Sequence, residues 1–256
     1  MQLEGKSAIV TGSSSGIGRA AALALAKAGA DVIVNGNSHM EKAEEVAHEI
    51  EGLGRQSLAV QADVSKSDDI DRLVTIAVDK LGKVDILFTN AGVFHMGYVE
   101  DHTPEMWMET LTVNLTGQFL TCQRVIPEMK KLGKGKIVNN GSIFGHQGVP
   151  GCIAYGVSKM GVHGMTRCLA VELAPHKINV NAVAPGATMT AMTDGFFVAM
   201  GDGDREAGIQ EVTKAYPIGR LGQPEDIGNA VVYLASDEAD FMTGQIMFVD
   251  GGYSVP

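Results

Sequence analysis

The residues best suited to chemistry are a tyrosine and a lysine four positions apart, Tyr155 and Lys159, in the run Tyr-Gly-Val-Ser-Lys. On a helix this spacing places both side chains on one face. A phenol with an unperturbed pKa near ~10 is a poor acid–base catalyst at neutral pH, but a neighbouring ammonium group lowers that pKa. We therefore expect Tyr155 to exchange a proton with a carbonyl or alcohol oxygen, with Lys159 as the tuning charge.

Two further polar residues accompany this pair. Ser142 comes thirteen positions before Tyr155, at the end of a predicted strand, where its hydroxyl could orient a substrate oxygen. An ordinary turn serine is the alternative. Asn114 lies inside a predicted helix, where asparagine is unfavourable because its side chain competes for backbone hydrogen bonds. An Asn114 that faces solvent, or is satisfied in the core, is the alternative to a functional role.

A glycine-rich turn, residues 11–18, reads Thr-Gly-Ser-Ser-Ser-Gly-Ile-Gly and joins the first predicted strand to the first predicted helix. Gly12 permits the tight turn, Gly16 lets a pyrophosphate approach the backbone, and Gly18 lets the helix pack closely on the sheet. The helix N-terminus offers free N–H groups and a positive dipole end to phosphate. The turn predicts a dinucleotide site, with a turn that binds no ligand as the alternative. We expect contacts from Gly12, Ser14, Ser15, Gly16, Ile17 and Gly18.

The elements that must position these residues alternate regularly along the chain. Strands are predicted at 7–10, 31–34, 58–60, 85–88, 136–138, 178–183 and 246–249. Helices are predicted at 17–28, 41–53, 67–81, 104–131, 155–174 and 224–235. This alternation predicts right-handed crossovers and a parallel sheet covered on both faces. A barrel is the alternative, but the glycine-rich turn favours a Rossmann-like, doubly wound α/β fold with about seven strands.

No repeat, linker or low-complexity segment divides the chain, so we predict a single NAD(P)-binding domain over residues 1–256. An insertion at about 188–216 breaks the alternation, and such insertions are usually functional lids or disordered loops. It follows the sixth strand and so leaves from the carboxyl edge of the sheet, where open α/β sheets bind ligands.

Composition excludes several functional classes. The formal net charge of −10 repels phosphodiester backbones, so we expect no nucleic-acid partner. No stretch approaches the ~18 apolar residues of a membrane span, and no signal peptide is visible. The three cysteines, Cys122, Cys152 and Cys168, form no CxxC motif, and the seven histidines form no metal-binding pattern. We therefore expect a cytoplasmic protein with no disulfide framework and no metal.

The motifs together resemble those of the short-chain dehydrogenase/reductase family, in the family's order and over nearly the whole chain. Thr-Gly-x-x-x-Gly-Ile-Gly matches its cofactor fingerprint, and Asn114, Ser142, Tyr155 and Lys159 match its catalytic residues. The resemblance implies that Asn114 opens its helix locally and holds a water in a proton relay from Lys159. It also implies further cofactor contacts from Asp63, Val64, Asn90, Ala91, Gly92, Tyr155, Lys159, Pro185, Gly186, Thr188 and Thr190.

The resemblance implies an NAD(P)-dependent oxidoreductase that interconverts a secondary alcohol and a ketone. Family members that act on sugars, polyols, diols or 3-oxoacyl compounds all remain open as models for the substrate. His146 and, more weakly, His95 are candidate substrate contacts, with surface histidines as the alternative. An extended-branch epimerase or dehydratase is disfavoured by the glycine spacing. A catalytically inactive cofactor-binding or sensing protein is the remaining alternative.

The resemblance also implies a homotetramer with two-fold axes. We expect the last predicted helix to supply an apolar interface through Ala230, Val231, Val232 and Leu234.

Cofactor choice depends on the end of the second strand, which reads Val-Asn-Gly-Asn-Ser from Val34 to Ser38. NAD-specific proteins place an acid here that binds the ribose 2′-hydroxyl. By resemblance Gly36 takes the place of that acid, while Ser15 and Asn37 take the places of NADP-type basic residues. Asn37, Ser38 and Ser15 could hydrogen-bond a 2′-phosphate without neutralising it. We expect NADP(H) to be modestly preferred, with NAD(H) as the alternative.

Overall fold

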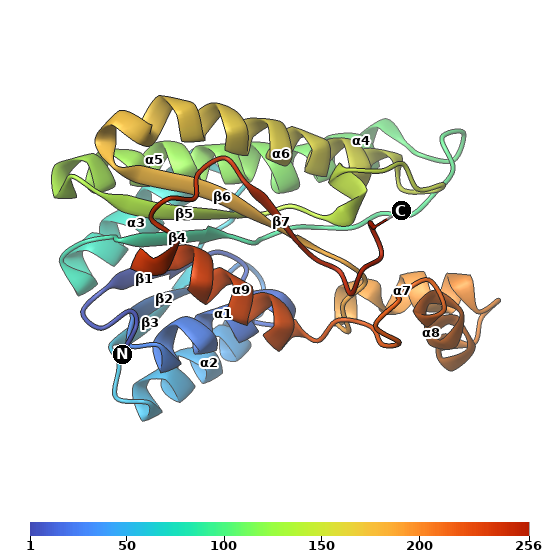
Figure 1. Cartoon of the computed structure of the whole chain (residues 1–256), viewed down its shortest axis with the longest axis horizontal. Helices are drawn as coiled ribbons and strands as arrows, with labels where there is room; N and C mark the ends of the chain where they lie inside the picture. Colours follow the sequence, from blue (N-terminus) through green and yellow to red (C-terminus); the bar gives the residue numbers. More distant parts are fainter. Residues whose placement is uncertain (256) are drawn as a thin grey trace.

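The computed structural model describes residues 1–255 and contains a sheet of seven parallel strands in the order β3-β2-β1-β4-β5-β6-β7 (Figure 1). The strands are β1 (Ser7–Val10), β2 (Asp31–Gly36), β3 (Ser57–Gln61), β4 (Ile86–Thr89), β5 (Gly135–Asn140), β6 (Ile178–Pro185) and β7 (Ile246–Val249). The order reverses direction between β1 and β4, which creates the crevice where doubly wound sheets bind ligands. The expected Rossmann-like α/β fold is confirmed.

Helices cover both faces of this sheet, with α1, α2 and α9 on one side and α3, α5 and α6 on the other (Figure 1). The helices are α1 (Gly16–Lys27), α2 (Met40–Gly52), α3 (Ser67–Leu81), α4 (Pro104–Leu111), α5 (Gly117–Leu132), α6 (Ile153–Leu173), α7 (Ala191–Met200), α8 (Arg205–Thr213) and α9 (Pro224–Ala235). The central strands are therefore covered on both faces by apolar helix surfaces, which is why their sequences are largely apolar, whereas the edge strands β3 and β7 are partly exposed.

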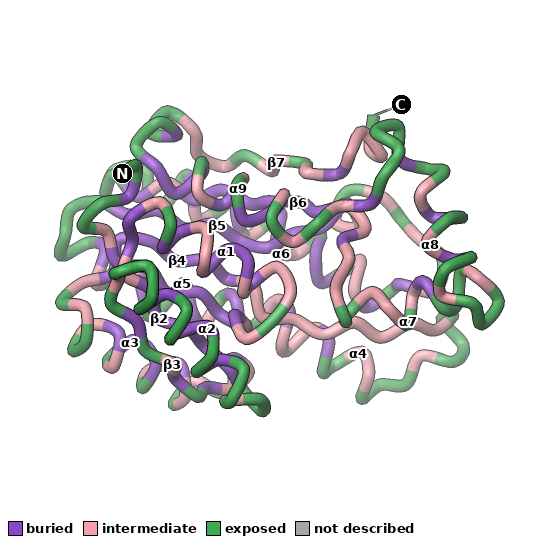
Figure 2. The backbone as a smooth tube through the Cα atoms, turned by 90° about the horizontal axis from the view of Figure 1, so that it is seen from below, coloured by how far each residue is buried: buried purple, intermediate pink, exposed green. Residues whose placement is uncertain are grey.

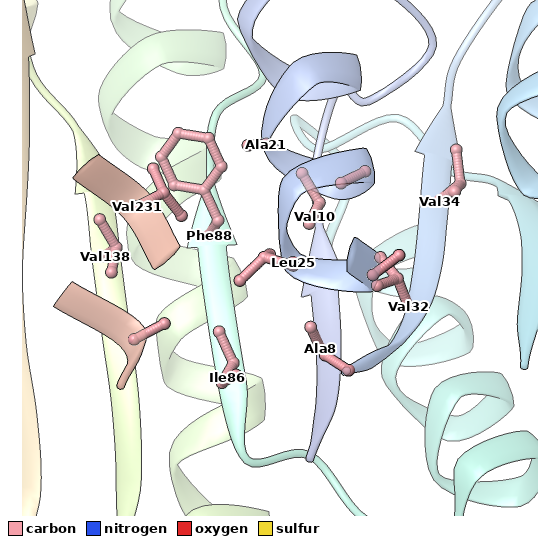
Figure 3. Close-up of a cluster of buried hydrophobic side chains, with 14 of the residues drawn as sticks. Ala8, Val10, Ala21, Leu25, Val32, Val34, Ile86, Phe88, Val138 and Val231 are labelled. Atoms are coloured by element: carbon pink, nitrogen blue, oxygen red, sulfur yellow. The ribbon is translucent and has the colours of Figure 1, made fainter. Parts of the chain in front are cut away.

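The core consists of one apolar cluster on each face of the sheet. Along β1, Ala8 and Val10 face the α1 side while Ile9 faces the α3 side, as the two-residue period of a strand requires. Figure 3 shows the first cluster, in which Phe88 of β4 packs near Leu25 of α1. Figure 2 shows that burial concentrates on the strands, while the outer faces of the helices are exposed. Fully burying each such side chain contributes about 1.5–3 kcal/mol.

The long helix predicted over 104–131 is interrupted. Thr103 caps α4 by accepting a hydrogen bond from Met106 N, as the Thr-Pro start predicts. After Leu111 the chain forms a π-helical turn, Thr112–Thr116, before α5 continues. Asn114 lies at the centre of this turn. Such turns often mark functional sites, and the local opening agrees with what the family resemblance implied for Asn114.

The insertion forms two helices, α7 and α8, where the sequence predicted a lid or a disordered loop (Figure 1). Gly208 allows these helices to pack closely: a Cβ on Gly208 would lie 1.7 Å from the Phe197 carbonyl oxygen, so α7 and α8 can cross at this distance only because Gly208 has none. Phe197, Val212 and Tyr216 form a small apolar cluster between them. Because glycine is frequent in this segment, its sequence did not predict the two short helices.

The last helix, α9, corrects another expectation. Val231 and Leu234 were expected to face a partner subunit, but both are buried in the core of this chain against the sheet. Tyr233, 40% exposed, is the large apolar residue that α9 presents outward. The apolar residues of α9 therefore pack on the sheet of the same chain.

Within residues 1–255, no helix has both the length and the apolar character needed to cross a membrane.

Candidate active site

A cavity of about 550 Å³ lies over the crevice between β1 and β4 and gathers nearly all the predicted cofactor contacts. The predicted residues that line it are Gly12, Ser14, Ser15, Gly16, Ile17, Asn37, Ser38, Asp63, Val64, Asn90, Ala91, Gly92, Tyr155, Lys159, Pro185, Gly186, Thr188 and Thr190. Gly18 is the exception, because it lies behind the turn against the sheet. Segments from Gly12 to Thr190 thus meet at the carboxyl edge of the sheet.

The glycine-rich turn has the geometry that a pyrophosphate needs. Gly12 and Gly16 have positive φ angles of 61° and 53°, a conformation that favours glycine. A Cβ on Gly12 would lie 2.7 Å from the Ala91 Cα atom. Ser15 caps α1 without a side-chain hydrogen bond, so the first N–H groups of the helix are available to an anion. The residues present therefore fit a dinucleotide.

Three asparagines, Asn35, Asn90 and Asn140, hold this cavity together. Gly12 N donates to Asn35 Oδ1 at 3.0 Å, which ties the turn to β2. Asn90 Nδ2 donates to the Gly12 carbonyl at 2.9 Å, and Asn140 Nδ2 donates to Asn90 Oδ1 at 3.0 Å. Lys159 Nζ donates to the Asn140 carbonyl at 2.7 Å, so the network runs from the turn to the lysine.

Of these three, Asn90 was predicted only as a cofactor contact, and Asn35 and Asn140 were not predicted at all. The available signal was their position, since a polar residue that ends a buried strand lies at the ligand edge of the sheet. Asn140 Oδ1 is buried and has no hydrogen-bond partner among the described residues. A buried acceptor left unpaired at the wall of a cavity is a natural partner for a ligand donor.

Ser142, Tyr155 and Lys159 meet at one end of the cavity. Helix α6 begins at Ile153, two residues earlier than predicted, and carries Tyr155 and Lys159 on one face. Lys159 Nζ lies 5.4 Å from the centroid of the Tyr155 ring. Ser142 lies two residues after the end of β5. Its hydroxyl accepts a hydrogen bond from Phe144 N at 3.1 Å. The three predicted reacting groups are thus brought together, with Ser142 and Lys159 buried and Tyr155 half-buried.

Burial determines the electrostatics of this group. Loss of hydration raises the pKa of Tyr155 to about 12, while a hydrogen bond with Ser142 acts in the opposite direction. Loss of hydration also lowers the pKa of Lys159 to about 7. Lys159 was expected to lower the Tyr155 pKa, but the net shift of that pKa is upward. The reason is that both groups lose hydration, which is the largest cause of each shift.

Asn114 is fully buried and uses its amide to fix the backbone after β4. Its Oδ1 accepts a hydrogen bond from Val93 N at 2.7 Å, and its Nδ2 donates to the Val93 carbonyl at 2.9 Å. Nδ2 also lies 3.3 Å from Ser158 Oγ on α6. Asn114 therefore links the π-helical turn, the Asn-Ala-Gly segment and the helix that carries Tyr155. The role in holding a water stays a prediction.

A second cavity, of about 800 Å³, meets the first at the reacting residues. Ser142, Tyr155, Pro185, Gly186, Met192 and Thr193 line both cavities. Phe94 and Phe144 contact the Tyr155 ring edge-on, with ring centroids 4.9 and 6.1 Å away. A molecule in the second cavity would therefore reach Tyr155 from the side opposite the glycine-rich turn.

The two histidines considered as substrate contacts line neither cavity. His146 is exposed and contacts the Phe248 ring, with centroids 5.3 Å apart. His95 Nε2 lies 3.0 Å from Glu109 Oε2. Cys152 is buried at the start of α6, and burial raises the pKa of its thiol to about 11, which makes it a poor nucleophile.

Comparison with known sequences gives a consistent set of relatives. A family model described as enoyl-(acyl carrier protein) reductase matches residues 12–254. The chain is 40% identical over 247 residues to the 3-oxoacyl-(acyl-carrier-protein) reductase FabG of Staphylococcus epidermidis, which covers 96% of this chain and 98% of the relative. It is 39% identical over 252 residues to the FabG of Thermotoga maritima, with 98% and 99% of the two chains covered.

Solved structures agree over the full length. A short-chain type dehydrogenase/reductase from Mycobacterium marinum superposes with a TM-score of 0.91 at 35% identity, covering 100% of this chain and 98% of that one. Carveol dehydrogenase from Mycobacterium avium, solved in complex with NAD, superposes with a TM-score of 0.95 at 30% identity, covering 100% and 99%.

Proposed function

We propose that this chain, which belongs to the short-chain dehydrogenase/reductase family, interconverts a secondary alcohol and a ketone with a nicotinamide dinucleotide. The observation that carries the proposal is the meeting of two cavities at Ser142 and Tyr155. One cavity has the glycine-rich turn suited to a dinucleotide, and the other has room for a second reactant.

In the proposed reaction the bound nicotinamide supplies or accepts the hydride. Tyr155 donates its phenolic proton to the carbonyl oxygen during reduction and takes it back during oxidation. Ser142 orients the same oxygen through its hydroxyl. Lys159 lies close enough to stabilise the phenolate once Tyr155 has given up its proton, and the Asn140 carbonyl holds the lysine in place. Reactants that filled both cavities would cover Tyr155 and exclude water from the proton transfer.

The direct test is the oxidation of reduced nicotinamide, followed by its absorbance, in the presence of a panel of ketones and β-ketoacyl thioesters. We expect at least one panel member to be reduced at a rate that saturates with its concentration. A protein that binds the reduced cofactor but reduces no member of the panel would instead support the alternative of a cofactor-binding or sensing protein.

We also propose that the protein prefers NADP(H) modestly over NAD(H). Asn37, Ser38 and Ser15 line the cavity beside the end of β2 and offer neutral hydrogen bonds. Asn37→Arg adds a charge that pairs with a 2′-phosphate, so we expect it to raise the kcat/KM ratio of NADPH to NADH about tenfold. The measurement is kcat/KM with each cofactor at one fixed ketone concentration.

The control for this charge change is Asn229→Arg on the exposed side of α9, away from both cavities, which should leave the ratio unchanged. Gly36→Asp is a less clean test, because a Cβ there would lie 3.2 Å from Ala43 Cβ and Met40 Sδ. A wild-type protein whose kcat/KM is tenfold higher with NADH would contradict the preference.

We also propose a cytoplasmic homotetramer with two-fold symmetry. Several large apolar side chains remain exposed on single copies of the chain, among them Met108, Phe119, Tyr233, Phe241 and Phe248. We expect light scattering at micromolar concentration to give four times the 27.0 kDa chain mass. A mass of 27.0 kDa under these conditions would rule the assembly out.

A further inference from the structure

The second cavity is walled mainly by apolar and aromatic side chains. Phe94 and Phe144 flank Tyr155, Phe196 and Val212 form the opposite wall, and the Tyr216 and Tyr253 rings pack with centroids 5.0 Å apart. Apolar surface removed from water contributes about 25 cal/mol per Å². A bulky apolar group would therefore be bound well here, and a strongly hydrated one would lose its water without compensation.

Two polar side chains of this wall, those of Tyr216 and Thr193, are already engaged within the protein. Tyr216 OH accepts a hydrogen bond from Ala187 N at 2.6 Å. Thr193 Oγ1 donates to the Thr188 carbonyl at 2.7 Å. A sugar hydroxyl placed against either group would have to compete with these bonds, and a hydroxyl left without a partner costs about 1–3 kcal/mol. The wall therefore disfavours sugars and polyols.

The charges around this cavity disfavour phosphate. None of the described residues that line it is lysine or arginine, and the one charged lining residue is Glu211. Two nearby cations are already paired: Lys214 with Glu211, and Arg205 with Asp194 at 2.8 Å. Exposed acids follow the lining residues Tyr98 and Met200 in sequence, at Glu100, Asp101, Asp202 and Asp204. Acyl thioesters of coenzyme A or of carrier proteins bear phosphate groups at the far end of the pantetheine arm, where they would meet these rim acids, whereas proteins bind phosphate with arginine or lysine.

From these contacts we propose that the substrate is a free, uncharged ketone or secondary alcohol that bears a bulky apolar or aromatic group. This inference rests on the proposed oxidoreductase function and narrows it, since it excludes sugars, polyols and phosphate-bearing thioesters. It also separates this chain from what the names of its 3-oxoacyl-(acyl-carrier-protein) reductase relatives state.

The first experiment compares three carbonyl compounds with the wild-type protein: 1-tetralone, fructose and acetoacetyl-coenzyme A. We expect kcat/KM for 1-tetralone to exceed both others at least tenfold. A value for fructose or acetoacetyl-coenzyme A that equals or exceeds the value for 1-tetralone would overturn the proposal.

The second experiment changes the charge of the cavity. Met200 lies on α7, lines the cavity and is 44% exposed, so Met200→Arg places a cation at its rim. We expect this variant to lower kcat/KM for 1-tetralone about tenfold and to raise it for acetoacetyl-coenzyme A at least threefold. Val198→Arg is the matched control, because Val198 is 39% exposed on the same helix and does not line the cavity. If the two variants behave alike, the cavity does not select the substrate.

A binding measurement separates failure of this inference from failure of the proposed function. Calorimetric titration of 1-tetralone into the Tyr155→Phe protein needs no turnover, and burial of apolar surface gives a negative heat-capacity change. Binding that Met200→Arg weakens and Val198→Arg does not would support the assignment even if no ketone were reduced. Absence of 1-tetralone binding, in a protein that reduces other ketones, would refute it.

Discussion

Replacing Tyr155 with phenylalanine is expected to lower kcat by about 10²- to 10⁴-fold, because a correctly positioned proton donor contributes that much. Phenylalanine keeps the ring contacts with Phe94 and Phe144 and loses the transferable proton. The dissociation constant of the reduced cofactor should change less than threefold. The measurement pairs steady-state kinetics with a fluorescence titration of the reduced cofactor.

Tyr233→Phe is the matched control for this change. Tyr233 is exposed on α9, lines neither cavity, and its hydroxyl contacts only the Met242 sulfur at 3.5 Å among the described residues. We expect this variant to keep wild-type kcat. Retention of more than about a tenth of wild-type kcat by Tyr155→Phe would mean that another group transfers the proton.

Gly18→Ala is expected to destabilise the fold and to weaken cofactor binding at least tenfold. The new Cβ would lie 2.2 Å from the Gly12 carbonyl oxygen and 2.5 Å from Asn90 Nδ2, two atoms that are hydrogen-bonded to each other at 2.9 Å. The methyl group must push α1 away from the turn it supports. Overpacking costs about 1–3 kcal/mol, which in a protein of this size lowers Tm by at least a few degrees.

The control for Gly18→Ala is the same change at Gly164 in α6. A Cβ there has no atom within 4 Å outside its own helix, and alanine is the better helix former. We therefore expect Gly164→Ala to leave cofactor affinity unchanged and to raise the free energy of unfolding by up to ~1 kcal/mol. Thermal unfolding and cofactor titration on both variants decide the matter. A Gly18→Ala protein with wild-type affinity would show that the turn does not bind the dinucleotide.

The sequence was sufficient to predict the sheet, because each strand is a short apolar run and each helix has its own period. It also predicted which motifs meet at the first cavity, because motifs at the carboxyl ends of parallel strands must converge. The helices α7 and α8 could not be predicted, since glycines such as Gly208 serve a contact that exists only after folding. The burial of Val231 and Leu234 in this chain could not be distinguished from burial against a partner.

The electrostatics of the reacting group were equally hidden. The spacing of Tyr155 and Lys159 gives their proximity but not their burial, and burial decides the direction of both pKa shifts. The support network through Asn35 and Asn140 was missed because its bonds cross between strands that are distant in sequence. Residues at the carboxyl ends of neighbouring strands can be predicted to lie near each other. Which of them form hydrogen bonds with each other cannot be predicted from their spacing in the sequence.

The pairing of β1 with β4 has a consequence for how the chain folds. The hydrogen bond from Ser7 N to Asp85 Oδ2 spans 78 positions, whereas β2 follows β1 after a single helix. Closing so long a loop costs chain entropy before the contact stabilises anything, and such non-local pairings slow folding. The β1-β2-β3 unit can therefore form early, and β4 must dock onto its open edge. The first cavity lies across this junction, so a nucleotide can bind only after β4 has docked. Added nucleotide should therefore lower the unfolding rate and leave the rate of the early folding steps unchanged.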